Sequence, residues 1–214
     1  AEIDAVVEAI NHASRPMLFV GGGVIGANVS ETMRSIVSRL GAPVTTTLLG
    51  LGAIAADTKG FLGFAGMHGS YAANMTIQEC DLLLCIGMRF SDRVTGVVSG
   101  FAPKAKIVHF ELDEAEANKN VAADYRVLGD LRWSLPLLQA KLEQSGRTYA
   151  AENESWLEKA IDRSKEHPFS YQPDGDAIKP GALIRKISEL SDEDTIAVTD
   201  VGQHQMWAAQ FFDV

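Results

Sequence analysis

Blocks of basic residues and long apolar stretches are both missing from this sequence. Lysine and arginine total 19 against 28 aspartate and glutamate residues, a formal net charge of −9 at pH 7. Binding to a phosphodiester backbone needs a basic surface, so we expect no nucleic-acid partner. No apolar run approaches the roughly 20 residues of a membrane-spanning helix, so we expect no membrane segment either.

Cysteine is almost absent. Cys85 lies inside the apolar run 81–87, where a buried and unreactive thiol is the expected state, and Cys80 is the only other cysteine. Two cysteines cannot form the disulfide framework of a small secreted domain. A reducing cytoplasmic location fits this composition.

The composition that is present is typical of a folded protein with a large core. Hydrophobic residues make up 46% of the 214 residues and charged residues 22%. These values carry no signature of disorder. We therefore expect one large domain, or one domain with part of a second.

Helical patterns alternate with apolar, β-branched runs along the first two thirds of the chain. Strands are expected at 17–20, 43–48, 81–86 and 106–111, and helices at 3–10, 30–40, 71–77 and 130–142. Strands that alternate with helices pair in parallel through right-handed crossovers, and nearly continuous apolar strands indicate a sheet covered on both faces. The predicted fold is α/β, a doubly wound parallel sheet of Rossmann-like type.

Three segments of different character follow one another. Residues 1–145 are expected to form the central domain, and residues 146–180, which are polar and rich in glycine and proline, a linker with one helix at 156–165. Residues 181–214 are expected to begin a second α/β domain, with a helix to Leu190, a strand at 195–199 and a final helix. A unit this small cannot bury a core alone, so we expect it to be the truncated edge of something larger.

A glycine motif lies between the first expected strand and the next helix. Gly21, Gly23 and Gly26 have the spacing G-x-G-x-x-G, which lets main-chain N–H groups approach a pyrophosphate. A merely tight β-to-α turn would explain the same glycines. An NAD enzyme would also carry an acidic residue about 20 positions later, and residues 44–47 contain none, which argues against an oxidoreductase of that type.

Four further loops carry glycine or charge at expected strand ends. Each is ambiguous alone, since 63–69 could be a structural loop and 87–96 a solvated charged one. Together they favour an extended dinucleotide bound along the carboxyl ends of the strands. The four are residues 63–69 with His68, residues 87–96 with two arginines, residues 111–113, and Gly129 with Asp130.

Four long motifs occur in an order that resembles the catalytic subunits of acetohydroxyacid (acetolactate) synthases, which are thiamine-diphosphate enzymes. They are Val44-Thr-Thr-Thr-Leu-Leu-Gly-Leu-Gly52, Gly66-Met-His-Gly69, Gly87-Met-Arg-Phe-Ser-Asp-Arg-Val-Thr-Gly96 and Val201-Gly-Gln-His-Gln-Met-Trp-Ala-Ala-Gln210. The resemblance covers essentially the whole chain. It implies a piece of such a subunit, with the FAD-binding middle domain and the start of the thiamine-diphosphate-binding domain.

The resemblance also implies site residues. Arg93 is expected to recognise the carboxylate of the second 2-keto acid, which suits a guanidinium fork. Two positions depart from the family pattern, since Ser91 replaces an aspartate and Met88 a smaller residue. The implied flavin contacts are Gly21, Gly22, Gly23, Thr47, Leu48, Met67, His68, Gly69, Gly87, Met88, Arg89, Ser91, Arg93, Val94, Glu111, Leu112 and Asp130. The implied contacts to the diphosphate of thiamine diphosphate are Val201, Gly202, Gln203 and His204.

For the whole enzyme, the resemblance implies decarboxylation of pyruvate and condensation with pyruvate or 2-oxobutanoate, toward branched-chain amino acids. The flavin would be largely structural, and Mg²⁺ would accompany thiamine diphosphate. The family's catalytic glutamate and metal-binding G-D-G motif have no match here, and Gly175-Asp176-Ala177 is no substitute, so we expect no metal ligand and no activity in this piece alone. A homodimer or tetramer and a small regulatory subunit are the implied partners.

One alternative stays open at this point. The same strand-end loops would serve an adenine-nucleotide-binding middle domain of another thiamine-diphosphate carboligase or decarboxylase, which senses a nucleotide without chemistry.

Overall fold

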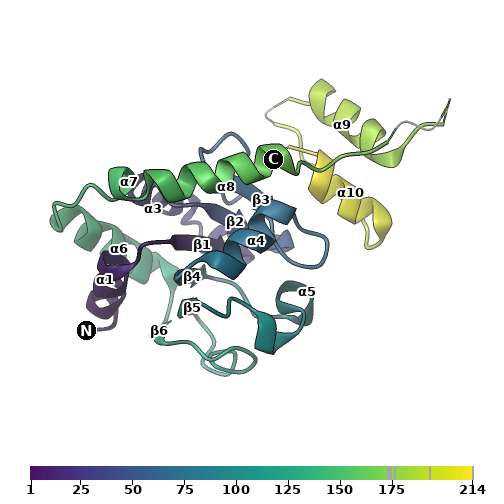
Figure 1. Cartoon of the computed structure of the whole chain (residues 1–214). Helices are drawn as coiled ribbons and strands as arrows, with labels where there is room; N and C mark the ends of the chain where they lie inside the picture. The colour runs from purple at the N-terminus through teal and green to yellow at the C-terminus, as the bar shows by residue number, and fades with distance from the viewer. Residues whose placement is uncertain (173–174, 176, 193, 214) are drawn as a thin grey trace.

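A six-stranded, all-parallel sheet forms the centre of the molecule in the computed structural model, which describes residues 1–172, 175, 177–192 and 194–213 (Figure 1). The spatial order of the strands is β3-β2-β1-β4-β5-β6. This order reverses between β1 and β4, so the doubly wound α/β prediction is confirmed. The strands are β1 (Pro16–Val20), β2 (Val44–Thr46), β3 (Phe61–Phe64), β4 (Leu82–Ile86), β5 (Lys106–Glu111) and β6 (Tyr125–Leu128).

Helices cover both faces of the sheet because the central strands are apolar on both sides. Leu18 and Val20 of β1 enter one core, whereas Met17 and Phe19 enter the other. The first core is closed by α1 (Glu2–His12), α3 (Ser30–Leu40) and α6 (Leu131–Gln144), and the second by α4 (Tyr71–Glu79) and α8 (Glu154–Glu166). Short turns complete the unit: α2 (Gly22–Gly26), α5 (Asp92–Thr95), α7 (Tyr149–Glu152), η1 (Leu48–Gly50) and η2 (Val98–Gly100).

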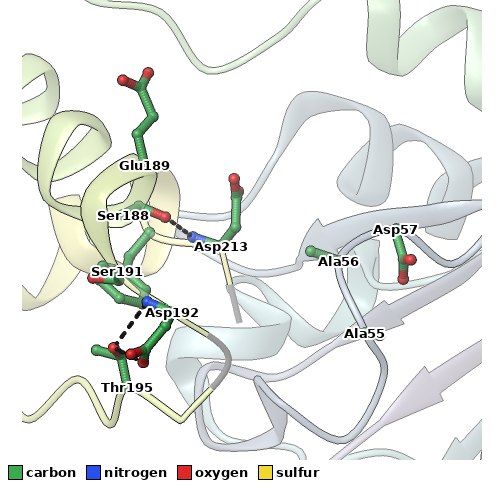
Figure 2. A pocket seen from close by; sticks show the side chains of 10 residues that line it. Ala55, Ala56, Asp57, Ser188, Glu189, Ser191, Asp192, Thr195 and Asp213 are labelled. Atoms are coloured by element: carbon green, nitrogen blue, oxygen red, sulfur yellow. Dashed lines mark hydrogen bonds between the residues drawn. The ribbon is translucent and has the colours of Figure 1, made fainter.

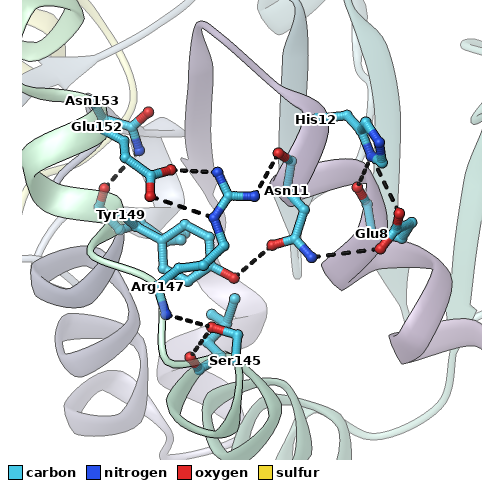
Figure 3. A network of polar contacts seen from close by, with 10 residues as sticks. Glu8, Asn11, His12, Ser145, Arg147, Tyr149, Glu152 and Asn153 are labelled. Atoms are coloured by element: carbon cyan, nitrogen blue, oxygen red, sulfur yellow. Dashed lines mark hydrogen bonds and ion pairs between the residues drawn. The ribbon is translucent and has the colours of Figure 1, made fainter.

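Residues 146–166 form two helices that are fixed to the sheet unit. Trp156 Nε1 donates to the Pro16 carbonyl at 2.9 Å, and Asn153 Nδ2 donates to the Leu40 carbonyl at 2.7 Å. Figure 3 shows the neighbouring network, in which Arg147 donates to the Asn11 carbonyl at 2.7 Å and pairs with Glu152. All these groups lie at the amino edge of the sheet, where α1 and α3 end. The expected helix at 156–165 is present as α8, and it belongs to the packed core.

The last two helices pack on each other and against one end of the sheet unit. α9 (Pro180–Leu190) and α10 (Gln203–Phe211) contact closely where the Phe211 ring lies against Gly181. Phe169 connects the two units, since its ring lies 6.2 Å from both the Phe64 and the Phe211 rings. Pro173, Asp176, Glu193 and Val214, which belong to segments discussed above, lie outside the described residues.

The strand expected at 195–199 is wrong. These residues have no regular secondary structure, and Ile196 and Val198 are 86% and 87% exposed. A strand needs a neighbour for its main-chain hydrogen bonds, and the described structure offers none beside this segment. Its β-branched pattern therefore remains without a sheet to join.

Candidate functional site

The parallel sheet brings the sequence-predicted loops to one edge, because every strand ends on the same side. Gly21 follows β1, Thr47 follows β2, Gly87 follows β4, and Asp130 follows β6. Open α/β sheets bind ligands at this edge, beside the point where the strand order reverses. Here that point lies between β1 and β4, with Gly21–Gly23 on one side and the loop 87–96 on the other.

Gly21 and Gly23 are required by the protein's own main chain. An added Cβ would lie 2.2 Å from the Gly87 carbonyl oxygen at Gly21 and 2.8 Å from the same atom at Gly23. Their N–H groups already donate to the carbonyls of Ile86 and Gly87, both at 2.9 Å. The tight-turn interpretation therefore explains these two glycines without a ligand. An added Cβ at Gly22 would lie 2.8 Å from the Leu49 carbonyl, so the β2 loop closes on the same turn.

The β2 and β3 loops continue the edge. Thr47 is 9% exposed and its N–H donates to the Val20 carbonyl, which fixes the start of η1 and Leu48. Met67 and His68 are exposed at the tip of the loop after β3. Gly69 must be glycine, because its Cβ would lie 2.4 Å from the Phe64 carbonyl oxygen.

Two guanidinium groups occupy the loop after β4. Arg89 and Arg93 are both exposed, and in the described part of the chain no carboxylate lies within ion-pair distance of either. Ser91 and Val94 shape the loop, since the Val94 N–H donates to the Ser91 carbonyl at 3.0 Å. Arginine forks suit phosphates and carboxylates, so these two side chains make the loop a candidate anion site at this edge.

The Met88 side chain points into the core, unlike the exposed side chain of Arg89 beside it. The side chain of Met88 is 3% exposed and packs in the second core, so any contact with a ligand would come from its main chain. The Met88 carbonyl already accepts a hydrogen bond from His109 Nε2 at 2.9 Å.

Sequence reasoning missed His109, which organises the end of β5. It is 1% exposed, and its Nε2 also lies 3.6 Å from Glu111 Oε2. Glu111 Oε1 accepts the N–H groups of Leu112 and Asp113 at 2.8 and 3.0 Å, so the carboxylate folds back over its own turn. Leu112 is 71% exposed beside it. The available signal was a histidine inside an otherwise apolar strand.

Asp130 caps α6 instead of standing free. Its Oδ1 accepts the Arg132 N–H at 2.9 Å, and its Oδ2 pairs with the Arg132 guanidinium at 2.6 Å. The hydrogen bonds from Arg132 hold the pKa of Asp130 below its usual value. A ligand at this position would meet an ionised carboxylate that already has a partner.

Residues 201–204 belong to the second unit. Val201 is 80% exposed, Gly202 has φ of 149°, and Gln203 and His204 open α10. The far end of α10 contacts the sheet unit, since Gln210 Nε2 donates to the His68 carbonyl at 2.9 Å. α10 therefore joins the 201–204 turn to the loop after β3 (Figure 1).

A cavity of about 570 Å³ lies elsewhere, between the turn at 55–57 and the end of α9 (Figure 2). Carboxylates from Asp57, Glu189, Asp192 and Asp213 line it, and no lysine or arginine does. This charge repels a diphosphate. The described residues also contain no group of three or more histidine, cysteine or acidic side chains that could hold a metal ion, and none of their helices is long and apolar enough to span a membrane.

Known proteins are similar to this chain over nearly its whole length. The Escherichia coli (strain K12) acetolactate synthase isozyme 2 large subunit is 42% identical over 210 residues, covering 98% of this chain and 37% of the relative. The Parasynechococcus marenigrum acetolactate synthase large subunit is 44% identical over 211 residues, 98% of this chain and 34% of the relative. The chloroplastic acetolactate synthase 1 of Nicotiana tabacum is 38% identical, with 98% and 31% coverage. The chain thus spans about a third of the length of these relatives.

A family model, the central domain of thiamine pyrophosphate enzymes, matches residues 3–139. This range runs from α1 into α6 and includes all six strands. The chain therefore belongs to the thiamine pyrophosphate enzyme central domain family.

Proposed function

We propose that the carboxyl edge of the sheet binds FAD, and that the chain is the flavin-binding part of an acetolactate synthase large subunit. The observation that carries the proposal is that Arg89 and Arg93 are exposed and have no carboxylate partner among the described residues, in a chain of net charge −9. Two such arginines at one strand end of an acidic protein support an anion site there, because guanidinium groups bind phosphates and carboxylates. The choice of FAD as the ligand comes from the resemblance to acetolactate synthases, and relatives of that printed name at 38–44% identity support that family.

The residues present fit a dinucleotide diphosphate in a specific way. Because the N–H groups of Gly21 and Gly23 already donate to the carbonyls of Ile86 and Gly87, the arginines and Gly22 would hold the phosphates. Exposed apolar side chains at the same edge, Leu49, Met67 and Leu112, would cover the rings. The acidic cavity near Asp57 plays no part in this.

In the longer protein, thiamine diphosphate with Mg²⁺ would supply the decarboxylation of a 2-keto acid and formation of the new carbon–carbon bond. This chain would contribute the loop at Val201–His204 toward the cofactor's diphosphate. Arg93 would orient the carboxylate of the second keto acid, pyruvate or 2-oxobutanoate, by a paired hydrogen bond. Assembly as a homodimer or tetramer, with a small regulatory subunit, in the cytoplasm is part of the same proposal.

Flavin titration tests the binding proposal directly. We expect FAD fluorescence to be quenched on addition of the chain, and Arg89→Ala with Arg93→Ala to weaken binding about tenfold or more together. Arg15→Ala is the matched control, because Arg15 is an exposed arginine at the opposite edge, before β1. Equal affinity for ADP and FAD would instead favour the adenine-nucleotide-binding alternative, and no binding of either would overturn the proposal.

Activity needs a second assay. A chain extended at both ends to the length of the relatives should form acetolactate from pyruvate with thiamine diphosphate, Mg²⁺ and FAD. The 214-residue chain alone should form none. Acetolactate formation by the short chain would contradict the division of roles described above.

A further inference from the structure

Arg93 is held by the loop after β3. The Met67 N–H donates to the Arg93 carbonyl at 2.9 Å, and an added Cβ at Gly66 would lie 2.5 Å from that carbonyl oxygen. Within the described chain, the Arg93 guanidinium donates one hydrogen bond, from Nη1 to Met67 Sδ at 3.8 Å. A thioether is a weak acceptor, so this contact restrains the guanidinium lightly and leaves it available to an anion.

Met67 is unlike the other methionines. It is 61% exposed, whereas Met17, Met33 and Met88 are at most 3% exposed. The remaining two, Met75 and Met206, are partly buried. Oxidation by peroxide follows exposure, because the oxidant must reach the sulfur. Met67 is therefore the thioether most open to attack, and it contacts the arginine assigned to anions.

We propose that Met67 is a reversible oxidation site that controls the availability of Arg93. A peroxide transfers one oxygen atom to Sδ: the S–O bond forms, the O–O bond breaks, the sulfur loses two electrons, and the peroxide leaves as water. The product is a sulfoxide, whose oxygen is a far stronger hydrogen-bond acceptor than a thioether. The sulfoxide oxygen therefore accepts a hydrogen bond from the adjacent Arg93 guanidinium.

The consequence for binding rests on the proposed function. When Arg93 donates to the sulfoxide oxygen, it no longer donates to a phosphate or carboxylate at the strand edge. Arg89 is four residues away in the same loop, and no hydrogen bond joins it to Met67 in the described part of the chain, so oxidation of Met67 leaves the Arg89 guanidinium available. Bound FAD would cover Met67 and protect it, so cofactor and peroxide compete for one loop.

The first test needs no ligand. The 214-residue chain is treated with graded hydrogen peroxide and digested, and the oxidised peptides are quantified by mass spectrometry. We expect Met67 sulfoxide to form before Met75 or Met206 sulfoxide. After oxidation, modification of Arg93 by phenylglyoxal should slow about threefold or more, while Arg89 serves as the internal reference and reacts as before. The inference would be overturned if Met67 were oxidised after Met75 or Met206, or if phenylglyoxal modified Arg93 at the same rate before and after oxidation.

The second test adds FAD. Oxidised wild type should bind FAD about tenfold more weakly, and methionine sulfoxide reductase should restore the affinity. Met67→Leu sets its own baseline affinity, and peroxide should not change it further; Met206→Leu should respond like wild type. If unoxidised chain fails to bind FAD, the proposed function fails while the phenylglyoxal result still decides this inference. If oxidation leaves FAD affinity unchanged, this inference fails alone.

Discussion

Gly21 and Gly26 belong to one sequence motif but have different surroundings. An added Cβ at Gly21 would lie 2.2 Å from a main-chain oxygen, whereas at Gly26 nothing lies within 4 Å. We expect Gly21→Ala to lower the free energy of unfolding by at least about 3 kcal/mol, because main chain must move. Gly26→Ala should raise it by about 0.5–1 kcal/mol, because the unfolded chain loses freedom. Urea unfolding measures both, and equal effects would contradict the main-chain explanation.

His109 gives a second expectation for a single residue. Replacement by leucine leaves the Met88 carbonyl without its donor in a buried place, so the free energy of unfolding should fall by about 1–3 kcal/mol. His109→Gln keeps an N–H donor and should lose less. Chemical denaturation of both variants compares them directly. If His109→Gln lowers the free energy of unfolding as much as His109→Leu does, then packing and not the hydrogen bond accounts for the contribution of His109 to stability.

Single residues also show where the sequence was insufficient. The loops and their arginines were placed at strand ends from the alternation of patterns alone. The reason for Gly21 and Gly23 was not visible, because the Gly87 carbonyl that excludes their Cβ atoms is more than 60 residues away in sequence. His109 was missed for a similar reason, since its acceptor, the Met88 carbonyl, lies in the loop after β4, 21 residues away in sequence.

Among the elements, α8 is joined to α4 by one carboxylate in addition to its core packing. Glu79 accepts hydrogen bonds from Lys159 and Arg163, both at 2.8 Å. Lys159 first, and then Arg163, hold the pKa of Glu79 below its usual value of 4.5. Folding therefore favours the ionised form, and the stabilisation is complete above pH 4.5 and lost as the pH falls through the lowered value.

Glu79→Gln measures this contribution. At pH 7 the variant should be about 1 kcal/mol less stable than wild type, since the pair is only partly buried. The difference should shrink once the pH falls below 4.5. Glu158→Gln, on the exposed surface of α8, is the control. A difference that stays constant down to acid pH would show that charge is not responsible.

The predicted elements succeeded where an element was long or central. Strands 81–86 and 106–111 and helix 130–142 correspond closely to β4, β5 and α6. The two strands that were not predicted, β3 and β6, are the outer strands of the sheet, and each has only four residues. Gly63 within β3 and Arg126 within β6 interrupt the apolar pattern that identifies a strand.

At the scale of the whole molecule, the second unit exposes an apolar surface. Leu190, Ile196, Val198 and Val201 are each between 77% and 87% exposed. Exposed β-branched segments without a partner strand pair with other chains. We expect concentration-dependent association of the chain, and Ile196→Lys with Val198→Lys should reduce it without affecting FAD binding. Sedimentation velocity at several concentrations measures this, and an unchanged distribution in the double variant would place the contact elsewhere.

The hydrogen bond from Gln210 to the His68 carbonyl fixes one end of α10 at the loop after β3, so this helix connects two candidate cofactor positions. His204 and Gln210 are six positions apart, which is roughly 9 Å along a helix axis. A shift of either end is carried to the other, because a helix of this length moves as one body. If the proposed cofactor positions are both occupied, a change at the turn 201–204 would reach the loop after β3 through α10.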